Sequence, residues 1–378
     1  GDQSRPDLFA LQIEPRRPLC ERTIEISGRR RPDGSVLVEL DERLLRERLT
    51  AAREAGLESL AVALPHAGAD PRDEHRVREL AEEVGFPWVT LGSEVSTLPG
   101  LLARLETSLV DAFCSPVLVA YLERLRERLG LPEPEDGSKT TSAPRLRVMT
   151  SSGRLVDLGS VRGREAVLSG PAGGVSALVG LARQTGQPQL IGWDMGGTST
   201  DVSLFDGGAA SDSSDSDDSA KKTPNVGDVD GSEDVGGFDR LERVETLTVA
   251  GVRMRVAALR IETVAAGGGS ICRLETGRLV VGPESAGADP GPAAYRRGGP
   301  LTVTDVNLWL GRVQPDLFPP VFGPGGNEPL DLDAVRKQLD PLASELGVSS
   351  HRLAADLHDV ASESMTAPIR SLADAEGR

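Results

Sequence analysis

The sequence predicts a mixed α/β fold with parallel strands. Charged segments with apolar side chains at helical spacing alternate with short, strongly apolar runs, which is the order that helix–strand repeats produce. Three glycine-rich junctions, at 169–174, 194–201 and 267–270, also adjoin predicted strands. Such junctions at the carboxyl ends of strands form the ligand crevice of open α/β sheets. We therefore expect a ligand site where these junctions meet.

The first quarter of the chain is expected to hold strands followed by a helix–strand repeat. In chain order, the patterns predict strands within 8–40 joined by a turn at 31–34, a helix at 41–55, a buried strand at 59–64, a helix at 73–84 and a strand at 87–91. Because helix and strand alternate twice, this stretch is expected to contain parallel strands.

The middle of the chain begins with a long helical pattern at 98–129, which we expect to be interrupted at Pro116 because proline lacks the N–H of a helical hydrogen bond. A turn-rich loop at 130–143 and a strand at 145–149 follow. A helix of small residues is then expected from Ser169 to Leu181, leading into the strand that carries Asp194. A further strand is expected at 255–261.

An acidic insertion rich in serine and aspartate is expected at 208–237. Residues 206–239 contain ten acids and two lysines, for a net charge of −8. The segment has almost no apolar side chains and cannot offset its ordering entropy, so we expect it to be disordered. Its runs of serine and aspartate could also accept phosphate or bind Ca²⁺ weakly, although the spacing of a helix–loop–helix calcium site is absent.

Charge and cysteine usage exclude several classes of protein. The 378-residue chain has a formal net charge of −16, which argues against binding to nucleic acid or to an anionic membrane surface. Its three cysteines, Cys20, Cys114 and Cys272, form no Cys-x-x-Cys pair, so neither a zinc site nor a disulfide framework is expected. A reducing, cytoplasmic location fits best. No apolar run reaches the roughly 18 residues of a membrane span, and the polar N-terminus does not resemble a signal peptide.

Residues 189–204 are typical of a strand–turn–strand that binds phosphate. An apolar strand leads into a run of acids, glycines and hydroxyls, whose candidate site residues are Asp194, Gly196, Gly197, Thr198, Thr200 and Asp201. Glycines let a phosphate approach backbone N–H groups, while hydroxyls and carboxylates can reach a phosphate oxygen or its Mg²⁺. A glycine-rich β-hairpin turn without a ligand is the alternative.

Two further glycine clusters are candidates for the same site. One contains Gly267, Gly268, Gly269 and Ser270, and the other contains Gly173 and Gly174 near a helix start. Helix starts with free N–H groups favour anions, although helix capping or close packing would explain either cluster alone. The sequence has neither a P-loop nor a Gly-x-Gly-x-x-Gly fingerprint, so nucleotide binding would be of another type.

Other polar residues allow two interpretations. Asp305 and Asn307 could contact substrate or metal, but Thr304 or Asp305 could equally cap a helix at 306–310. The four histidines show no metal-ligand spacing. Cys114 and Cys272 are expected to be small buried hydrophobic residues rather than nucleophiles.

Several blocks, in order, resemble one known family. They lie at 166–175, 192–202, 261–270, 281–295, 298–307 and 310–312. Through them the chain resembles the hydantoinase/oxoprolinase family, and the blocks at 281–287 and 322–330 are most similar to members that hydrolyse 5-oxo-L-proline. The resemblance implies an actin/hexokinase/Hsp70-like ATPase fold with ribonuclease H-like domains. Residues 1–97 would then be the remainder of the family's N-terminal domain, and 98–378 its core domain.

The resemblance also implies a function. ATP and Mg²⁺ would be the cofactors, and the substrate would be a cyclic amide, with 5-oxo-L-proline giving L-glutamate in glutathione metabolism. Gly196, Gly197 and Thr198 would donate to phosphate, and Asp194 would hold the metal. Asp201 and Thr200 are second choices. A homo-oligomer or pairing with a hydantoinase B-type domain is expected.

Alternatives to this function stay open. The chain could be a hydantoinase or a subunit of an ATP-dependent carboxylase, another ATPase of the same fold, or a non-catalytic fragment. It lacks the family's first acid-Gly-Gly-Thr turn and its Phe-Gly-Gly-Ala-Gly run. The fold is therefore expected to be incomplete at both ends, and the chain alone to have little ATPase activity.

Overall fold

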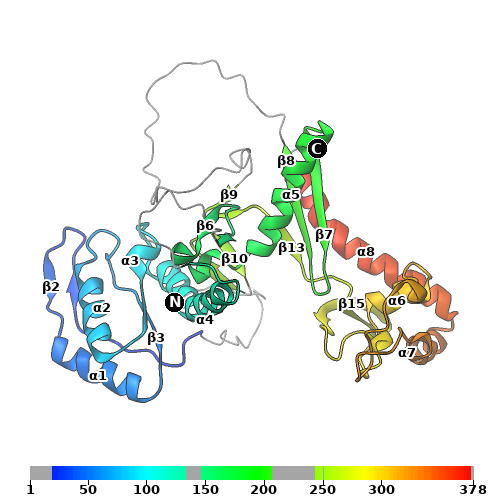
Figure 1. Cartoon of the computed structure of the whole chain (residues 1–378), viewed down its shortest axis with the longest axis horizontal. Coiled ribbons are helices and arrows are strands. Elements are labelled where there is room, and N and C mark those ends of the chain that lie inside the picture. Colours follow the sequence, from blue (N-terminus) through cyan, green and yellow to red (C-terminus); the bar gives the residue numbers. More distant parts are fainter. Residues whose placement is uncertain (1–18, 133–145, 207–242, 250, 376–378) are drawn as a thin grey trace. The chain divides into compact units, whose positions relative to one another are not determined.

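The computed structural model describes residues 19–132, 146–206, 243–249 and 251–375 (Figure 1). These residues form two compact units. Unit 1 contains Arg243–Ala258 and the described residues up to Ser169, and unit 2 contains the described residues from Gly170 to 206 and from Leu259 onward. The expected acidic insertion at 208–237 lies outside the described residues, as do the first part of 8–40 and most of the loop at 130–143.

Unit 1 begins with the expected helix–strand repeat. Its elements are β1 (Arg29–Arg30), β2 (Val36–Val38), α1 (Glu42–Glu54), β3 (Ser59–Val62), α2 (Arg72–Val84), β4 (Trp88–Leu91) and α3 (Gly92–Val95). β3 and β4 pair in parallel, as the alternation predicts. The Asp41 side chain caps α1 by accepting a hydrogen bond from the N–H of Leu44 at 2.9 Å. Leu45, Leu49 and Leu80 form a buried core between the helices and the strands.

Helix α4 (Leu101–Arg128) is continuous, so the interruption expected at Pro116 is wrong. A proline inside a helix removes one backbone hydrogen bond, and the packing of α4 inside unit 1 offsets that loss. Val110 and Leu122 are buried in two apolar clusters of the unit. α4 is also long and apolar enough to cross a membrane by length and composition. Its buried Asp111 is nevertheless paired with polar groups of unit 1, as in a helix of a protein core.

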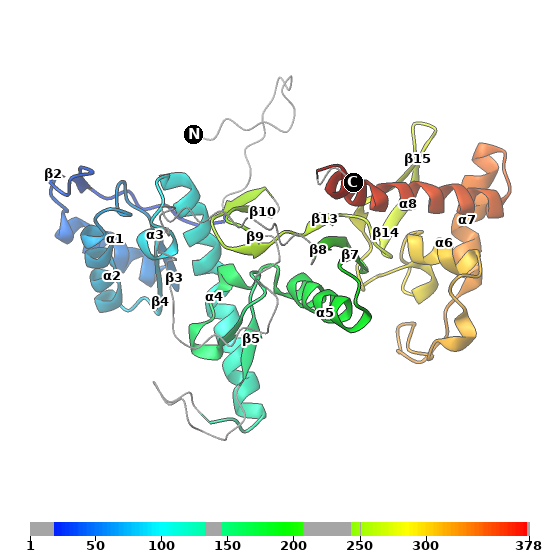
Figure 2. The same cartoon turned by 90° about the horizontal axis from the view of Figure 1, so that it is seen from above.

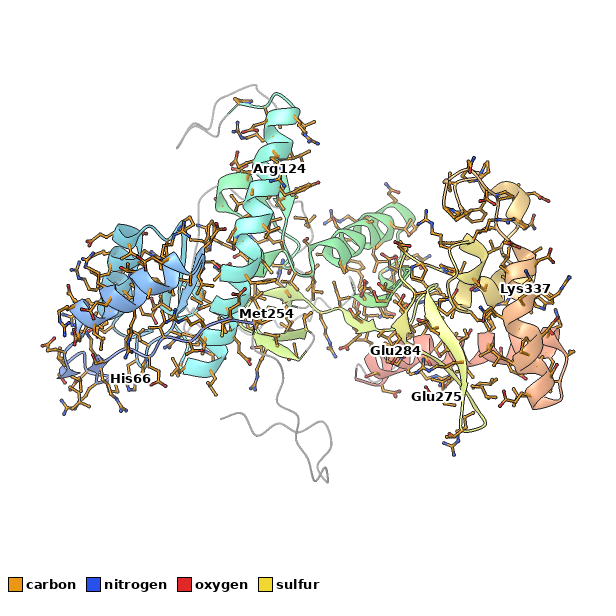
Figure 3. All side chains as sticks on the ribbon, turned by 90° about the horizontal axis from the view of Figure 1, so that it is seen from below. His66, Arg124, Met254, Glu275, Glu284 and Lys337 are labelled. Atoms are coloured by element: carbon orange, nitrogen blue, oxygen red, sulfur yellow. The ribbon has the colours of Figure 1, made fainter. Side chains whose placement is uncertain are left out.

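Short strands complete unit 1. They are β5 (Arg147–Met149) and β6 (Leu155–Asp157), which pair with each other, then β9 (Arg243–Val244), β10 (Leu247–Val249) and β11 (Val252–Met254). β10 and β11 form an antiparallel hairpin whose Met254, labelled in Figure 3, is 1% exposed and packs in the cluster that contains Val110. A continuous strand at 255–261 is wrong: the chain there contains β12 (Ala258–Leu259), and β13 (Glu262–Val264) follows.

The expected domain boundary at residues 97 and 98 does not separate the two units. The Arg104 guanidinium of α4 donates to the Leu64 carbonyl beyond β3 at 2.7 Å. The Asp111 carboxylate of α4 accepts a hydrogen bond from the Thr90 hydroxyl of β4 at 3.0 Å. These buried polar contacts join α4 to the helix–strand repeat before it.

Unit 2 begins with three layers. A three-stranded antiparallel sheet has the order β13, β8 (Thr200–Asp206), β7 (Gln189–Met195). α5 (Ser169–Thr185) lies on one face, where an added Cβ on Gly192 would be 3.0 Å from Leu178. The end of α8 (Ser350–Ala375) lies on the other face, where its Ile369 and Leu372 approach Leu204. Figures 1 and 2 show both helices beside the β7–β8 hairpin.

The rest of unit 2 packs around α8. Its elements are the hairpin β14 (Ser270–Glu275) and β15 (Arg278–Ser285), the short turns η4 (Ala293–Tyr295) and η5 (Pro315–Leu317), and the helices α6 (Val303–Trp309) and α7 (Leu332–Leu346). Val303, Val335, Leu339, Leu353 and Leu357 are buried in one apolar core.

Candidate functional site

The expected phosphate turn joins β7 to β8. The strand register places Asp194 opposite Asp201 and Met195 opposite Thr200, so residues 196–199 form the turn. The Gly196 N–H closes it by donating to the Ser199 carbonyl at 2.8 Å. The strand–turn–strand predicted from the sequence is confirmed.

The turn presents unused hydrogen-bond donors. Gly196, Gly197 and Thr198 are exposed. Among the described residues, the N–H groups of Gly197 and Thr198 and the Thr198 hydroxyl have no hydrogen-bond partner. An added Cβ on Gly197 would meet no atom within 4 Å. The turn can therefore admit a phosphate and donate to it.

Two carboxylates lie beside the turn on one face of the sheet. Residues directly opposite each other in an antiparallel pair share a face, so Asp194 and Asp201 are neighbours. The Thr263 hydroxyl of β13 donates to the Asp201 carboxylate at 2.6 Å. Like charges placed directly opposite each other destabilise a sheet, and a divalent cation between them would offset the repulsion. Oxygen ligands of this kind suit Mg²⁺.

Helix α5 lies on the face that carries the two carboxylates. An added Cβ on Gly174 would be 3.9 Å from Oδ2 of Asp194, and one on Gly173 would meet nothing within 4 Å. The structure thus brings Gly174 next to Asp194, while Gly173 leaves open space on the helix surface. The start of this helix at Ser169 agrees with the sequence prediction.

The glycine segment Gly267–Ser270 packs directly against the phosphate turn. Gly268 N–H donates to the Gly196 carbonyl at 3.0 Å, and Gly269 N–H donates to the Gly197 carbonyl at 2.6 Å. Gly267 N–H donates to the Ser270 hydroxyl at 2.9 Å, and Ser270 N–H donates to the Gly267 carbonyl at 3.1 Å. The segment adjoins the site as expected, but all four of its N–H groups already have partners inside the protein.

Gly267 must be glycine for this approach. An added Cβ would lie 2.7 Å from the Gly196 carbonyl oxygen and 2.9 Å from the Ser199 nitrogen. The Thr200 hydroxyl closes the same junction from β8 by donating to the Ala266 carbonyl at 2.6 Å, and Thr200 is fully buried. Thr200 therefore holds the turn in place from inside the protein.

Asp305 lies in a buried helix cap. This is the capping role that the sequence allowed as an alternative to contact with substrate or metal. It forms a capping box with Thr302 at the start of α6. Its carboxylate accepts hydrogen bonds at 2.8–3.0 Å from the N–H groups of Ala293, Ala294 and Thr302 and from the Thr302 hydroxyl. Burial raises the pKa of Asp305, and these hydrogen bonds oppose that rise. Asn307 is half-buried, and its side-chain amide donates to the Val303 carbonyl at 3.1 Å.

Cys272 and Cys114 are at least partly buried, as the sequence predicts. Cys272 is buried, and burial raises the pKa of its thiol to about 12. Cys114 is partly buried, and burial also raises its pKa. Within the described ranges, no group of three or more histidine, cysteine, aspartate or glutamate residues could hold a metal ion.

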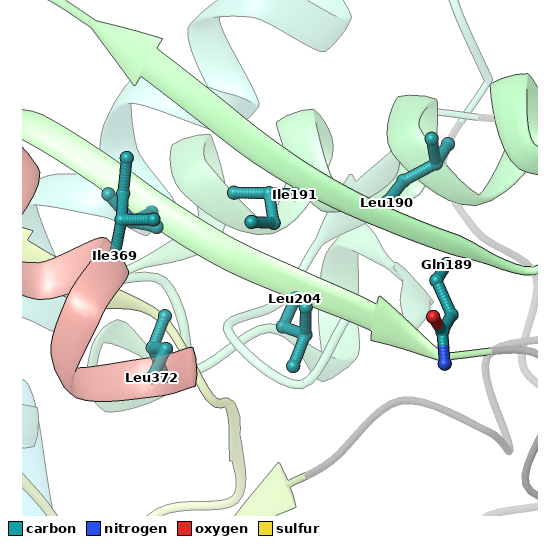
Figure 4. Close-up of a pocket in the computed structure, with 7 residues that line it drawn as sticks. Gln189, Leu190, Ile191, Leu204, Ile369 and Leu372 are labelled. Atoms are coloured by element: carbon teal, nitrogen blue, oxygen red, sulfur yellow. The ribbon is translucent and has the colours of Figure 1, made fainter. Parts of the chain in front are cut away.

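An apolar cavity of about 210 Å³ lies on the opposite face of the sheet from the carboxylates (Figure 4). Its lining residues come from β7, β8 and the end of α8, and they are Gln189, Leu190, Ile191, Val202, Leu204, Ile369 and Leu372. Because this lining offers almost no polar groups, the cavity is distinct from the phosphate turn.

Comparison with known proteins decides the family. The model of the hydantoinase/oxoprolinase family matches residues 104–378, and that of its N-terminal region matches residues 1–85. The chain belongs to the hydantoinase/oxoprolinase family. Within this family, the 5-oxoprolinase of Saccharomyces cerevisiae is 36% identical over the whole chain, and 5-oxoprolinase 1 of Arabidopsis thaliana is 35% identical over the whole chain. The chain spans 29% of the length of each.

Solved structures show the fold of this hydantoinase/oxoprolinase chain. The ATP-dependent caprolactamase from Pseudomonas jessenii superposes with a TM-score of 0.62 at 30% identity, over 97% of this chain and 48% of that one. A nucleotide-free acetone carboxylase superposes with a TM-score of 0.69 at 22% identity, over 93% of this chain and 45% of that one. The α/β, actin/hexokinase-like fold expected from the sequence is confirmed.

Sequence reasoning missed two threonines at the site. Thr263 is not among the residues predicted from the sequence, although its register opposite Asp201 gives it a contact to that carboxylate. Thr304 was considered as a cap, yet its hydroxyl donates to the Gly268 carbonyl at 2.9 Å. Only a prediction of strand pairing could have found the first, and no local pattern signals the second.

Proposed function

We propose that this chain is part of an ATP-dependent enzyme that hydrolyses a cyclic amide, 5-oxo-L-proline, to L-glutamate. The observation that carries the proposal is the turn between β7 and β8, where unpaired N–H groups lie beside two opposed carboxylates. Relatives named 5-oxoprolinase match the whole chain, and a relative named caprolactamase subunit alpha matches 93% of it. These names support a cyclic amide as the substrate class.

The residues of the turn fit a nucleotide phosphate and its metal ion. The N–H groups of Gly197 and Thr198 and the Thr198 hydroxyl would donate to phosphate oxygens. Asp194 would hold Mg²⁺, with Asp201, directly opposite it on β8, as a further oxygen ligand. The open space at Gly173 and the proximity of Gly174 to Asp194 support a role for the α5 surface in lining the same site.

When bound, ATP would supply a phosphoryl group to the amide oxygen, which makes the amide carbon electrophilic enough for water to attack and lets phosphate leave as the ring opens. The chain's own residues stabilise charge rather than take part in covalent chemistry. Fixed N–H donors act most strongly on charge that develops during transfer, because they need no reorganisation. The Thr263 hydroxyl donates a hydrogen bond to Oδ1 of Asp201 and so fixes the orientation of that carboxylate on the sheet.

The setting of the enzyme is part of the proposal. A second, hydantoinase B-type polypeptide or domain would complete it, as the name of caprolactamase subunit alpha suggests for a relative. The spacing of the cysteines favours a cytoplasmic location. Membership of the hydantoinase/oxoprolinase family supports ribonuclease H-like domains. Glutathione metabolism is the pathway that produces its substrate in this proposal. Asp305 and Asn307 would support α6 rather than contact the substrate.

The test is ATP hydrolysis by the complete gene product with Mg²⁺, with and without 5-oxo-L-proline. We expect stimulation by 5-oxo-L-proline, and a loss of at least about a hundredfold in Asp194→Asn because the metal loses its carboxylate. Asp316→Asn, which changes an exposed carboxyl of η5 in the same unit, serves as the matched control and should retain full activity.

Each other outcome has a definite meaning. Stimulation by a hydantoin, or by a ketone with bicarbonate, but not by 5-oxo-L-proline would refute the proposed substrate. It would still support the proposed ATPase activity. Full activity in Asp194→Asn would refute the role of the β7–β8 turn.

A further inference from the structure

We infer that Gly267–Gly269 is a brace that aims the phosphate turn and does not itself contact the nucleotide, and that Thr304 is the positioning residue that anchors it. The inference rests on the proposed function, because it concerns how the same turn presents its donors. The sequence makes Gly267–Ser270 a candidate for the same phosphate site as the turn at 196–199. The hydrogen bonds between the two segments instead assign phosphate binding to the turn and positioning to Gly267–Gly269.

The first step is the direction of two peptide groups. In a planar trans peptide, the carbonyl of one residue and the N–H of the next point in opposite directions. The carbonyls of Gly196 and Gly197 both point at the brace, where they accept the N–H groups of Gly268 and Gly269. The N–H groups of Gly197 and Thr198 must therefore point away from the brace. These are the two N–H groups that have no partner among the described residues.

The second step is that the brace has no donor left for a ligand. The N–H of Gly267 is bonded to the Ser270 hydroxyl, and those of Gly268 and Gly269 are bonded to the turn. Direct binding of phosphate by this segment would require these bonds to break and would leave the Gly196 and Gly197 carbonyls without donors. Replacing hydrogen bonds within the protein by hydrogen bonds to a ligand changes the free energy little. The arrangement favours positioning over contact.

The third step is the anchor. Both the N–H and the hydroxyl of Thr304 donate to the Gly268 carbonyl, at 2.8 and 2.9 Å. Thr304 belongs to the first turn of α6, whose Val303 and Val306 are buried in the core of unit 2 and whose start is fixed by the capping box of Asp305. On the far side, Ala286 N–H donates to the Gly269 carbonyl at 2.8 Å. The direction of the phosphate donors is thereby set by the position of α6.

Amide hydrogen exchange of the nucleotide-free protein tests the brace without any activity measurement. We expect slow exchange at Gly268 and Gly269 and fast exchange at Gly197 and Thr198. Added MgATP should slow amide exchange at Gly197 and Thr198 and leave the exchange rates of Gly268 and Gly269 unchanged. Fast exchange at Gly268 and Gly269 that slows only with MgATP would overturn the inference, because the brace itself would then bind the ligand.

Nucleotide binding tests the anchor. Thr304→Val removes the hydroxyl donor at nearly constant shape, and the ratio of MgATP affinity to adenosine affinity should fall by about three- to tenfold, the effect of one hydrogen bond. Thr304→Ser should restore the ratio. Thr185→Val, which removes a hydroxyl bonded to the Leu181 carbonyl in the same unit, is the matched control and should leave it unchanged. An unchanged ratio in Thr304→Val would refute the role of Thr304.

The two proposals fail separately. A wild-type protein that binds MgATP no better than adenosine would refute the proposed function, while the exchange pattern without nucleotide would still decide whether the brace exists. The thermal stability of each variant is measured in the same experiment. A fraction of unfolded protein would lower the apparent affinities for MgATP and for adenosine equally and leave their ratio unchanged.

Discussion

At the scale of single residues, hydrogen-bond partners distinguish ligand-binding groups from structural ones. Asp194 is exposed beside an open turn, whereas Asp305 is fully buried and accepts from four donors. Both are aspartates in motifs rich in threonine and glycine, so the sequence alone treats them alike. Their surroundings assign Asp194 to the candidate site and Asp305 to the support of α6.

Removal of the Asp305 carboxylate should strongly destabilise unit 2. In Asp305→Ala the buried N–H groups of Ala293 and Ala294 lose their acceptor, and each unsatisfied buried donor costs about 1–3 kcal/mol. We expect a loss of about 3 kcal/mol in the free energy of unfolding, measured by urea denaturation. Asp333→Ala, at an exposed position of α7, is the comparison. A loss below about 1 kcal/mol would contradict the buried cap.

Cys272 should resist alkylation in the folded protein. The folded thiol keeps its proton up to a pKa of about 12, above the ordinary value of 9.0. Its contribution to stability is therefore complete below pH 9.0 and is lost as the pH rises toward about 12. At pH 8.5 we expect iodoacetamide to label the partly exposed Cys20 first and Cys272 only after denaturation, as measured by peptide mass spectrometry. Equal rates at the two sites would show that Cys272 is accessible.

At the scale of elements, polar contacts buried between elements fix their arrangement. In unit 1, the Asp111 carboxylate of α4 accepts hydrogen bonds from Thr90 of β4, from Ser115 and from the Arg164 guanidinium. In unit 2, Thr200, Gly267 and Thr304 join β8, the brace and α6. Each set connects residues that are far apart in sequence, so each specifies one packing of its elements.

The Asp111 contacts lead to a prediction for α4. In Asp111→Ala, the mostly buried Arg164 guanidinium loses its partner at 3.1 Å, and breaking a buried ion pair costs about 3–5 kcal/mol. We expect unit 1 to lose about 3 kcal/mol of stability while the nucleotide site in unit 2 is retained. Differential scanning calorimetry combined with MgATP binding measures both effects. Glu47→Ala, which removes only the exposed pair with Arg43, should change stability by less than about 0.5 kcal/mol.

At the scale of the whole molecule, exposed apolar faces remain. Phe113, Val117 and Tyr121 lie one turn apart on α4 and are 65%, 71% and 55% exposed. On the edge strand β7, Trp193 is 57% exposed. Exposed apolar surfaces of this kind mark contacts with other polypeptides.

The α4 face should make the 378-residue chain self-associate. We expect its sedimentation coefficient to rise with concentration, and we expect Val117→Glu to suppress that rise by placing a charge in the middle of the face. Lys337→Glu, on α7, is the control for the change in charge. A monomer at all concentrations, with no difference between Val117→Glu and wild type, would contradict the prediction.

The sequence by itself determined the family, the fold class and most elements. The amphipathic helices at 42–54 and 72–84 and the apolar strands between them follow from local periodicity. The phosphate turn follows from glycines and hydroxyls placed between two strands. The sequence did not predict that α4 is continuous or that the strand expected at 255–261 is broken. Burial overrides the local cost of Pro116, and packing divides the strand.

Tertiary structure alone decided which glycine cluster presents its donors and which supplies the brace. Glycine permits a close approach in both cases, and composition does not say what approaches. The pairing of Gly268 and Gly269 with the turn, Thr263 with Asp201, and Thr304 with Gly268 depends on hydrogen bonds between segments 36 to 72 residues apart. Such contacts have no local sequence signal, because they form only when the sheet and α6 have packed.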